Sequence, residues 1–388
     1  GSKIFISSGD NDLYENIVHL VLARTPGAPE GTKGLSLFIT PKIKVNEDGS
    51  LGDSNDVVCS KLEHKMGIHG SATCVLNYGD QGNCEGHLIG KEGEGIQTMF
   101  IMMNQARLDC GIQGEAQANL AYMMTEQFVK ERVQFKTEII NHPDVRRMML
   151  KMRAMSRGLR ALILYTADLF DKAEKDKKYE SYIGLLTPIC KSFCSDKGFE
   201  VAVEAMQCHG GYGYCHEYGV EQFARDIKIA SIYEGTNGIQ AMDFVLRKIL
   251  RDGGKSLRGI SEEIFKTSNN LDDTFTFERG VFSKVLGSAQ DAMGFIGKKA
   301  KKNEMNFVLQ NCKDFLDMAA HIVVAWRLME SAMIANDKID SAPSESEKSY
   351  LQSKVDDFRI YCAHFLPQAT AHAKTITAFE DDILSYQV

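Results

Sequence analysis

The apolar positions of the chain follow two different periods, and the change between them falls near residue 93. Before this point, short apolar or β-branched runs alternate with turns rich in glycine, proline and aspartate, such as Pro26–Pro29. Such runs bounded by turn residues are typical of strands. They predict strands at Lys3–Ser7, Ile17–Ala23 and Leu35–Thr40, and residues 1–93 are therefore predicted to form a small β unit.

In the rest of the chain the apolar positions recur with a helical period, which favours a helical bundle. Pro143 followed by Asp144 indicates a helix start, because proline in the first turn loses no hydrogen bond and an acid there suits the helix dipole. Gly210 and Gly211 are expected to end a helix, and residues 252–258 to form a linker. The expected helical stretches are about 95–135, 143–175, 181–208, 236–249, 278–302, 306–337 and 344–376.

The composition is that of a folded protein with more than one domain, since the 388 residues are 44% apolar and 25% charged. The formal net charge of −7 provides no positive field for a polyanion, so nucleic acid is a poor candidate partner. The ten cysteines are scattered through helical stretches, which indicates a reducing compartment, taken here as the cytoplasm. No run of about 18 apolar residues is seen, so no membrane span is expected.

The segment Tyr233-Glu234-Gly235-Thr236 offers the sharpest candidate chemistry. Gly235 leaves room for a substrate to approach the Glu234 carboxylate, while Thr236 can cap the helix expected after it. Burial against Tyr233 and a flat ligand would favour proton abstraction by the acid. The alternative is an ordinary capping acid at a helix start, and this segment alone favours that alternative.

A glycine-rich turn, Gln207–Tyr214, leaves the third long helix. Its exposed backbone N–H groups suit a pyrophosphate, but the turn alone favours a simple helix stop. The pairs Cys208-His209 and Cys215-His216 suggest zinc, but adjacent ligands point in different directions, so no metal site is predicted.

Two arginines stand out in the first long helical stretch. Arg132 and Phe135 are expected on one helix face, where they suit a phosphate and a ring, or else form an ordinary surface contact. Arg107 lies in an apolar stretch and needs a partner, which is either a ligand or a core carboxylate.

These segments occur in an order that resembles the acyl-CoA dehydrogenase family of flavoproteins, in particular its subgroup with an extra C-terminal helical domain, which includes 3-methylmercaptopropionyl-CoA dehydrogenase-like enzymes. The resemblance covers almost the whole chain. It implies a mainly α fold with a small β domain, divided into a partial middle β domain at 1–93, a helical bundle at 94–252 and an extra helical domain at 253–388. The motifs that carry it are KIFISSGDNDL at Lys3–Leu13, KMGIHGSATC at Lys65–Cys74, Arg132–Phe135, Gln207–Tyr214 and IYEGTNGIQ at Ile232–Gln240.

The resemblance implies an oxidoreductase of fatty acid metabolism that converts an acyl-CoA to a trans-2-enoyl-CoA. Glu234 corresponds to the base that removes the α-proton while a hydride passes from the β-carbon to FAD, and the N–H of Thr236 to a donor that polarises the thioester carbonyl. Tyr233, Gly235 and, more weakly, Arg107 correspond to substrate-facing residues. An electron-transfer flavoprotein is the implied electron acceptor.

The resemblance also assigns residues to the cofactor. Contacts to FAD are implied for Phe5, Ser7 and Thr236, with Phe5 in place of a frequent tryptophan. The residues that would reach the adenine and pyrophosphate of an FAD in a neighbouring subunit, and so imply a homodimer or homotetramer, are Arg132, Phe135, Gln207 and Gly211.

Family members normally begin with a helical domain and further strands, and this chain opens directly on the strand Lys3–Ile6. An upstream segment is therefore expected to be missing, and the chain alone is expected to bind FAD weakly or not at all. Two alternatives remain open: an acyl-CoA oxidase, and a non-catalytic homologue associated with nucleic acid. Against the second, we interpret as solvated or subunit-facing the basic residues Arg146, Arg147, Arg153, Arg157 and Arg160.

Overall fold

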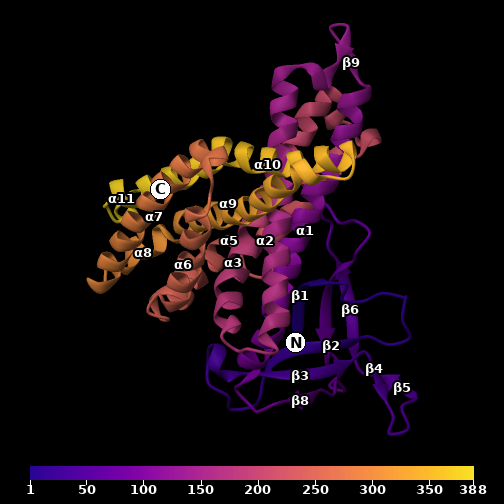
Figure 1. Ribbon diagram of the computed structural model, residues 1–388. Coiled ribbons are helices and arrows are strands. Elements are labelled where there is room, and N and C mark those ends of the chain that lie inside the picture. Colours follow the sequence, from indigo (N-terminus) through magenta and orange to yellow (C-terminus); the bar gives the residue numbers. More distant parts are fainter. The chain divides into compact units, whose positions relative to one another are not determined.

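The computed structural model describes residues 1–388, with the side chain of Ile101 excepted, and the chain divides into two compact units (Figure 1). The first unit, Gly1–Gln105, holds the strands of the small β domain, and the second, Ala106–Val388, is almost entirely helical. This architecture confirms a mainly α fold with a small β domain. The finer division into three domains stays a prediction.

The β unit is built from short antiparallel strands, and the three predicted strands are all present. They form two three-stranded sheets in the orders β1-β7-β6 and β2-β3-β8, together with the two-stranded β4-β5. The strands are β1 (Ser2–Ser7), β2 (Val18–Arg24), β3 (Leu35–Pro41), β4 (Ile43–Val45), β5 (Leu51–Ser54), β6 (Val57–Leu62), β7 (Thr73–Tyr78) and β8 (His87–Ile89).

The first strand finds its partner late in the β unit. β1 pairs with β7, from Ser2 opposite Asn77 to Ser7 opposite Thr73, with a register shift between Lys3 and Ile6. Because its partner comes about seventy residues later in the sequence, local pattern reading did not find it. β1 is thus an edge strand of this sheet, hydrogen-bonded on the side that faces β7.

Three long helices form the bundle of the second unit: α1 (Gly95–Glu131), α2 (Pro143–Ala173) and α3 (Tyr179–His209). The helix start at Pro143 and the stop at Gly210, which has φ 61°, are as predicted. α1 and α3 approach so closely that a Cβ on Gly114 would lie 2.2 Å from the carbonyl oxygen of Cys194. Glycine is therefore required at this crossing. Two short helices follow α3, namely α4 (Val220–Ile227) and α5 (Asn237–Met242).

The C-terminal helices share one continuous hydrophobic core with the bundle. The linker predicted at 252–258 is only partly correct, because a helix already begins at Lys255. Trp326, the one tryptophan of the sequence, is buried, and its indole N–H donates to Thr267 Oγ1 at 3.0 Å. The helices are α6 (Lys255–Asn269), α7 (Thr276–Lys301), α8 (Met305–Gln310), α9 (Cys312–Lys338), α10 (Glu345–His364) and α11 (Leu366–Ala378).

Three of the α2 arginines that were interpreted as solvated or subunit-facing pair within the unit instead. Arg153 and Arg157 each place a guanidinium nitrogen 2.7 Å from a carboxylate oxygen of the fully buried Asp357 in α10. Arg160 binds Glu115 of α1 at 2.9 Å. Sequence pattern did not reveal these pairs because each partner lies at least 45 residues away.

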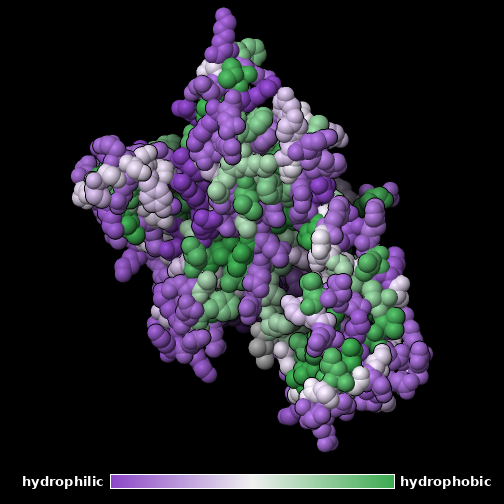
Figure 2. Space-filling model, turned by 90° about the vertical axis from the view of Figure 1, so that its right-hand side faces the viewer, coloured by the Kyte–Doolittle hydropathy of each residue, from purple (hydrophilic) through white to green (hydrophobic). Residues whose placement is uncertain are grey.

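One segment, Cys312–Ser341, is long and apolar enough to cross a membrane by length and composition, which the search for an apolar run had missed. In this structure 72% of its most apolar window is buried inside the protein, as in the core helix of a globular domain. Other apolar side chains remain at the surface, and Figure 2 shows them in separate patches with polar side chains between them.

Candidate active site

The loop that carries Glu234 adopts an unusual backbone conformation between the turn Lys228–Ser231 and α5. Glu234 has φ 55° and Gly235 has φ 82°, so two consecutive residues are left-handed. Glycine suits this region, whereas a non-glycine residue there stores strain of the kind that clusters at functional sites. A Cβ on Gly235 would lie 3.0 Å from Nε2 of Gln240, so a larger residue would push against the Gln240 amide in addition to straining the backbone.

A buried glutamine holds this loop in place. Nε2 of Gln240, in α5, donates to the carbonyl oxygens of Glu234 at 3.1 Å and Gly235 at 3.3 Å. Thr236 caps the helix as predicted, since its Oγ1 accepts from the N–H of Ile239 at 3.3 Å. The Glu234 side chain is exposed in this structure. The carboxylate is therefore open to a substrate.

The inner side of the loop rests on α1. The Tyr233 hydroxyl donates to Oε1 of Gln113, and burial raises the pKa of Tyr233 to about 12. Burial, with the nearby Glu234 charge second, raises the pKa of the Cys110 thiol to about 11. Both groups therefore keep their protons at neutral pH. The sequence analysis identified neither Gln113 nor Cys110.

Arg107 is occupied by an internal partner. It is 4% exposed, and its Nη1 lies 3.0 Å from Oδ2 of Asp243, which is itself buried next to α5. Of the two partners expected for this arginine, the structure shows the core carboxylate. A substrate-facing role for Arg107 is therefore not supported.

A second cluster lies at the far end of α1. The helix ends at Glu131, so Arg132 and Phe135 do not share a helix face as predicted but belong to a hairpin of β9 (Val133–Gln134) and β10 (Thr137–Glu138). Positive φ angles of 53° at Phe135 and 69° at Lys136 form the tight turn. The Phe135 ring at its tip is 88% exposed.

The glycine-rich turn joins this cluster from α3. The Arg132 guanidinium stacks over the Tyr212 ring, 5.0 Å from its centroid, and Phe128 stacks on His209. Gln207 and Gly211 are exposed, and a Cβ on Gly211 would meet nothing within 4 Å. A guanidinium, an exposed ring and open backbone together fit the pyrophosphate and ring of a nucleotide cofactor.

The two clusters are well separated along the same helix. Gln113, beneath the Glu234 loop, and Arg132 are 19 residues apart, or about 28 Å at 1.5 Å per residue. The remaining expected cofactor residues, Phe5 and Ser7, belong to the β unit, where both are exposed and Phe5 has φ 59°. The structure thus brings Arg132, Gln207 and Gly211 to one end of the bundle, away from Glu234.

The histidines of the two Cys-His pairs, His209 and His216, bind other groups. His209 is buried and its Nδ1 bonds the carbonyl oxygen of Ala205, whereas His216 bonds Glu221. Among the residues that the structure describes, no group of three or more histidine, cysteine or acidic side chains is placed to hold a metal. Each of the ten cysteines is free.

Comparison with known proteins gives two family matches. Residues 93–249 match the model described as acyl-CoA dehydrogenase, C-terminal domain, and residues 260–387 match the model described as acetyl-CoA dehydrogenase C-terminal like. The chain is 38% identical to 3-methylmercaptopropionyl-CoA dehydrogenase of Ruegeria pomeroyi over 99% of this chain and 67% of the relative. It is 36% identical to the broad-specificity linear acyl-CoA dehydrogenase FadE5 of Mycobacterium tuberculosis, over 99% of this chain and 68% of that relative.

The fold comparison agrees with these relatives. An acyl-CoA dehydrogenase of Bacillus anthracis, solved in complex with FAD, superposes with a TM-score of 0.73 at 23% identity, over 99% of this chain and 64% of that chain. The chain therefore spans about two thirds of the length of the proteins it matches.

Proposed function

We propose, from the premise that the chain belongs to the acyl-CoA dehydrogenase family, that the complete protein oxidises an acyl-CoA thioester to the trans-2-enoyl-CoA with FAD as cofactor. Glu234 is the proposed base. The observation that carries this role is the strained, glycine-dependent backbone at Glu234 and Gly235, which presents an exposed carboxylate from a loop clamped by Gln240.

The chain's own residues would move one proton in this reaction. The Glu234 carboxylate takes the α-proton, and the electron pair of that C–H bond forms the new C=C bond as a hydride leaves the β-carbon. FAD, when bound, supplies the acceptor for this hydride. The backbone N–H of Thr236 would donate to the thioester oxygen as charge develops there, which its position at the N-cap of α5, outside the helical hydrogen-bond ladder, supports.

The cofactor contacts are proposed in two groups. Phe5, Ser7 and Thr236 are the proposed flavin contacts. The cluster around Arg132 at the far end of α1 would hold the adenine and pyrophosphate of an FAD bound to a neighbouring subunit, because it lies about 28 Å along α1 from the Glu234 loop. A homodimer or homotetramer follows from this division. An electron-transfer flavoprotein is the proposed acceptor, and the cytoplasm the proposed compartment.

The test is product formation by the complete reading frame that encodes this chain, purified with FAD and assayed with acyl-CoAs of increasing length. We expect enoyl-CoA with one class of acyl chain, and a loss of at least about 10³-fold in kcat for Glu234→Gln. Glu217→Gln, which removes an exposed acid from the same unit, is the matched control and should keep full activity. Rapid peroxide release would identify an oxidase, and no product with any acyl-CoA would contradict the proposal.

A further inference from the structure

Asn237, which follows the Glu234 loop, is buried and forms hydrogen bonds with three other side chains. Asn237 is the first residue of α5 and is 6% exposed. Its Oδ1 accepts from Nζ of Lys191 at 2.8 Å, and its Nδ2 donates to Oδ1 of Asp196 at 2.8 Å and to Oγ of Ser195 at 3.0 Å. A cation at one end of the amide and an anion at the other fix its orientation.

Lys191 is the unusual member of this network. Its side chain is completely buried in α3, and the partner it binds there is a neutral amide oxygen. Burying an ammonium group costs free energy unless other groups compensate. Burial lowers the pKa of Lys191 to about 8, while the negative charges of Asp196 and Glu234 oppose this shift and the charge of Arg107 adds to it. A protein that needed only core packing here would use an apolar residue.

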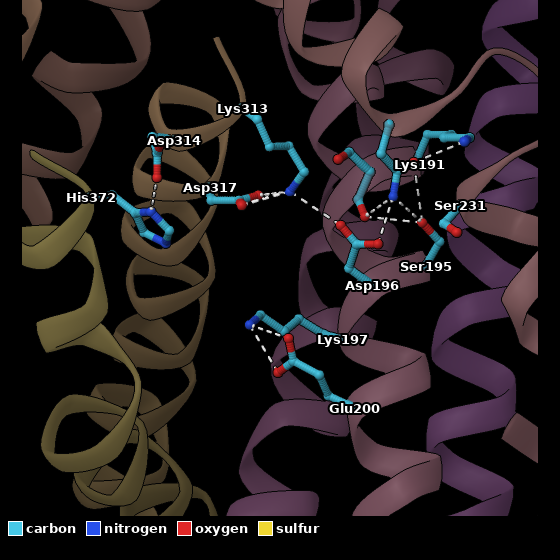
Figure 3. A network of polar contacts seen from close by, with 12 residues as sticks. Lys191, Ser195, Asp196, Lys197, Glu200, Ser231, Lys313, Asp314, Asp317 and His372 are labelled. Carbon is cyan, nitrogen blue, oxygen red and sulfur yellow. Dashed lines mark hydrogen bonds and ion pairs between the residues drawn. The ribbon is translucent and has the colours of Figure 1, made fainter. Parts of the chain in front are cut away.

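The C-terminal helices complete the network. Lys313 of α9 reaches toward α3, and Figure 3 shows its ammonium group between Asp317 and Asp196. Nζ of Lys313 lies 3.1 Å from Oδ2 of Asp196, whose other oxygen accepts from Asn237. One aspartate therefore connects the C-terminal helices to the start of α5, three residues after Glu234.

From this geometry we propose that Lys191 is a positioning residue for Glu234. The connected side chains of Lys191, Asn237, Asp196 and Lys313, called the lock below, hold the start of α5, and the C-terminal helices contribute Lys313 to it. The proposal rests on the proposed function, because it assigns the lock to the loop that carries the base. Through Lys313 the C-terminal helices would help to hold the loop that carries Glu234. Lys191 does not need to touch substrate or cofactor.

The first test is amide hydrogen exchange over residues 229–242 in the 388-residue chain, which needs neither FAD nor substrate. We expect exchange to become roughly tenfold to hundredfold faster in Lys191→Met and in Lys313→Met, because each removes a charged hydrogen bond from the lock. Lys197→Met is the matched control: it lies on the same helix, and its ammonium pairs with Glu200 outside the lock. Its exchange over residues 229–242 should equal that of the wild type.

Global unfolding separates positioning from general stability. Lys191→Met removes the cost of burying an ammonium group but leaves the buried Asn237 Oδ1 with only Ser195 Oγ at 3.4 Å. Because these two effects oppose each other, the unfolding midpoint, followed by Trp326 fluorescence, should change little even though the loop loosens. Lys313→Met, which is half-exposed, tests the lock independently if Lys191→Met does not fold. Adding Lys313→Met to Asp196→Ala should bring no further acceleration of exchange, because both act through one aspartate.

Unchanged exchange over residues 229–242 in both lysine variants, or equal acceleration in Lys197→Met, would overturn the proposal. In the complete enzyme, Lys191→Met should lower kcat about tenfold or more with little change in KM, since the base is misplaced while binding surfaces remain. An unchanged kcat in a variant with a loosened loop would also overturn it. If instead Glu234→Gln stays active while exchange responds as expected, the proposed base is wrong and the lock stands.

Discussion

The Arg107–Asp243 ion pair gives the sharpest prediction about stability. Arg107→Met removes a guanidinium whose Nη1 lies 3.0 Å from Asp243 Oδ2, where both residues are at most 8% exposed. The carboxylate that remains is buried, and its other contact is the half-exposed Arg247, 3.5 Å from Oδ1. Breaking a buried pair by removing one partner costs about 3–5 kcal/mol. Because Arg247 compensates in part, we expect about 3 kcal/mol, the lower end of this range.

The assay is urea denaturation of the 388-residue chain followed by Trp326 fluorescence. Trp326 is the only tryptophan in the sequence and is buried in the helical unit, so its emission reports the unfolding of the unit that contains the pair. The double variant Arg107→Met/Asp243→Leu should recover about 2 kcal/mol relative to Arg107→Met, because no unpaired charge is left. As a control, Arg247→Met removes the more exposed partner of the same carboxylate and should cost less than about 1 kcal/mol.

One result would refute this reasoning. This result is a free energy of unfolding for Arg107→Met within about 0.5 kcal/mol of the wild-type value, together with a raised KM for acyl-CoA in the complete enzyme that carries the same substitution. Arg107 would then face the substrate, and the pair with Asp243 would not be its main role.

Three further predictions concern single positions. Gly235→Ala should lower kcat of the complete enzyme about tenfold, because alanine in the left-handed backbone conformation costs about 1–2 kcal/mol and its Cβ would lie 3.0 Å from Gln240 Nε2. The control is Gly238→Ala, whose Cβ would lie 3.8 Å from Thr236 Oγ1 and which should keep full activity. His321 is fully buried, and burial holds its pKa well below 6.5. Below pH 6.5 the His321 ring takes up a proton in the unfolded chain but stays neutral in the folded protein. The free energy of unfolding should therefore fall as the pH drops from 6.5 to 5, and urea titrations at several pH values should show a shallower fall for His321→Gln. Phe135→Ala should leave the unfolding midpoint unchanged but make the complete protein lose FAD more easily on dilution. Phe277→Ala, which removes another exposed phenylalanine, should retain FAD, and equal retention by both variants would remove Phe135 from the cofactor site.

The sequence predicted the family and the mainly α fold, and the comparisons and the structure confirm both. FAD as the cofactor stays a proposal. Helix ends were found where local chemistry marks them, at Pro143 and Gly210. The short strands between Ile43 and Ile89 were not resolved individually, because three to six residues carry little alternation of their own.

Elements that depend on distant partners were not predictable in this way. The hairpin at Phe135 depends on positive φ angles at two residues other than glycine, which give no local turn signal. Lys191 reads as a surface residue in sequence, since lysine is almost never fully buried, and only the packing of α3 against α5 shows its position. Gln240, Gln113 and Asp243 likewise gain their roles from contacts that no spacing rule specifies.

The most direct test of the central claim is an anaerobic titration of the complete, FAD-loaded protein with acyl-CoA, followed by the absorbance of the oxidised flavin. We expect the flavin band to bleach in proportion to acyl-CoA in the wild type and in Glu217→Gln, and Glu234→Gln to bind the same ligand without bleaching. Bleaching of Glu234→Gln at the wild-type rate would contradict the assignment of Glu234 as the base.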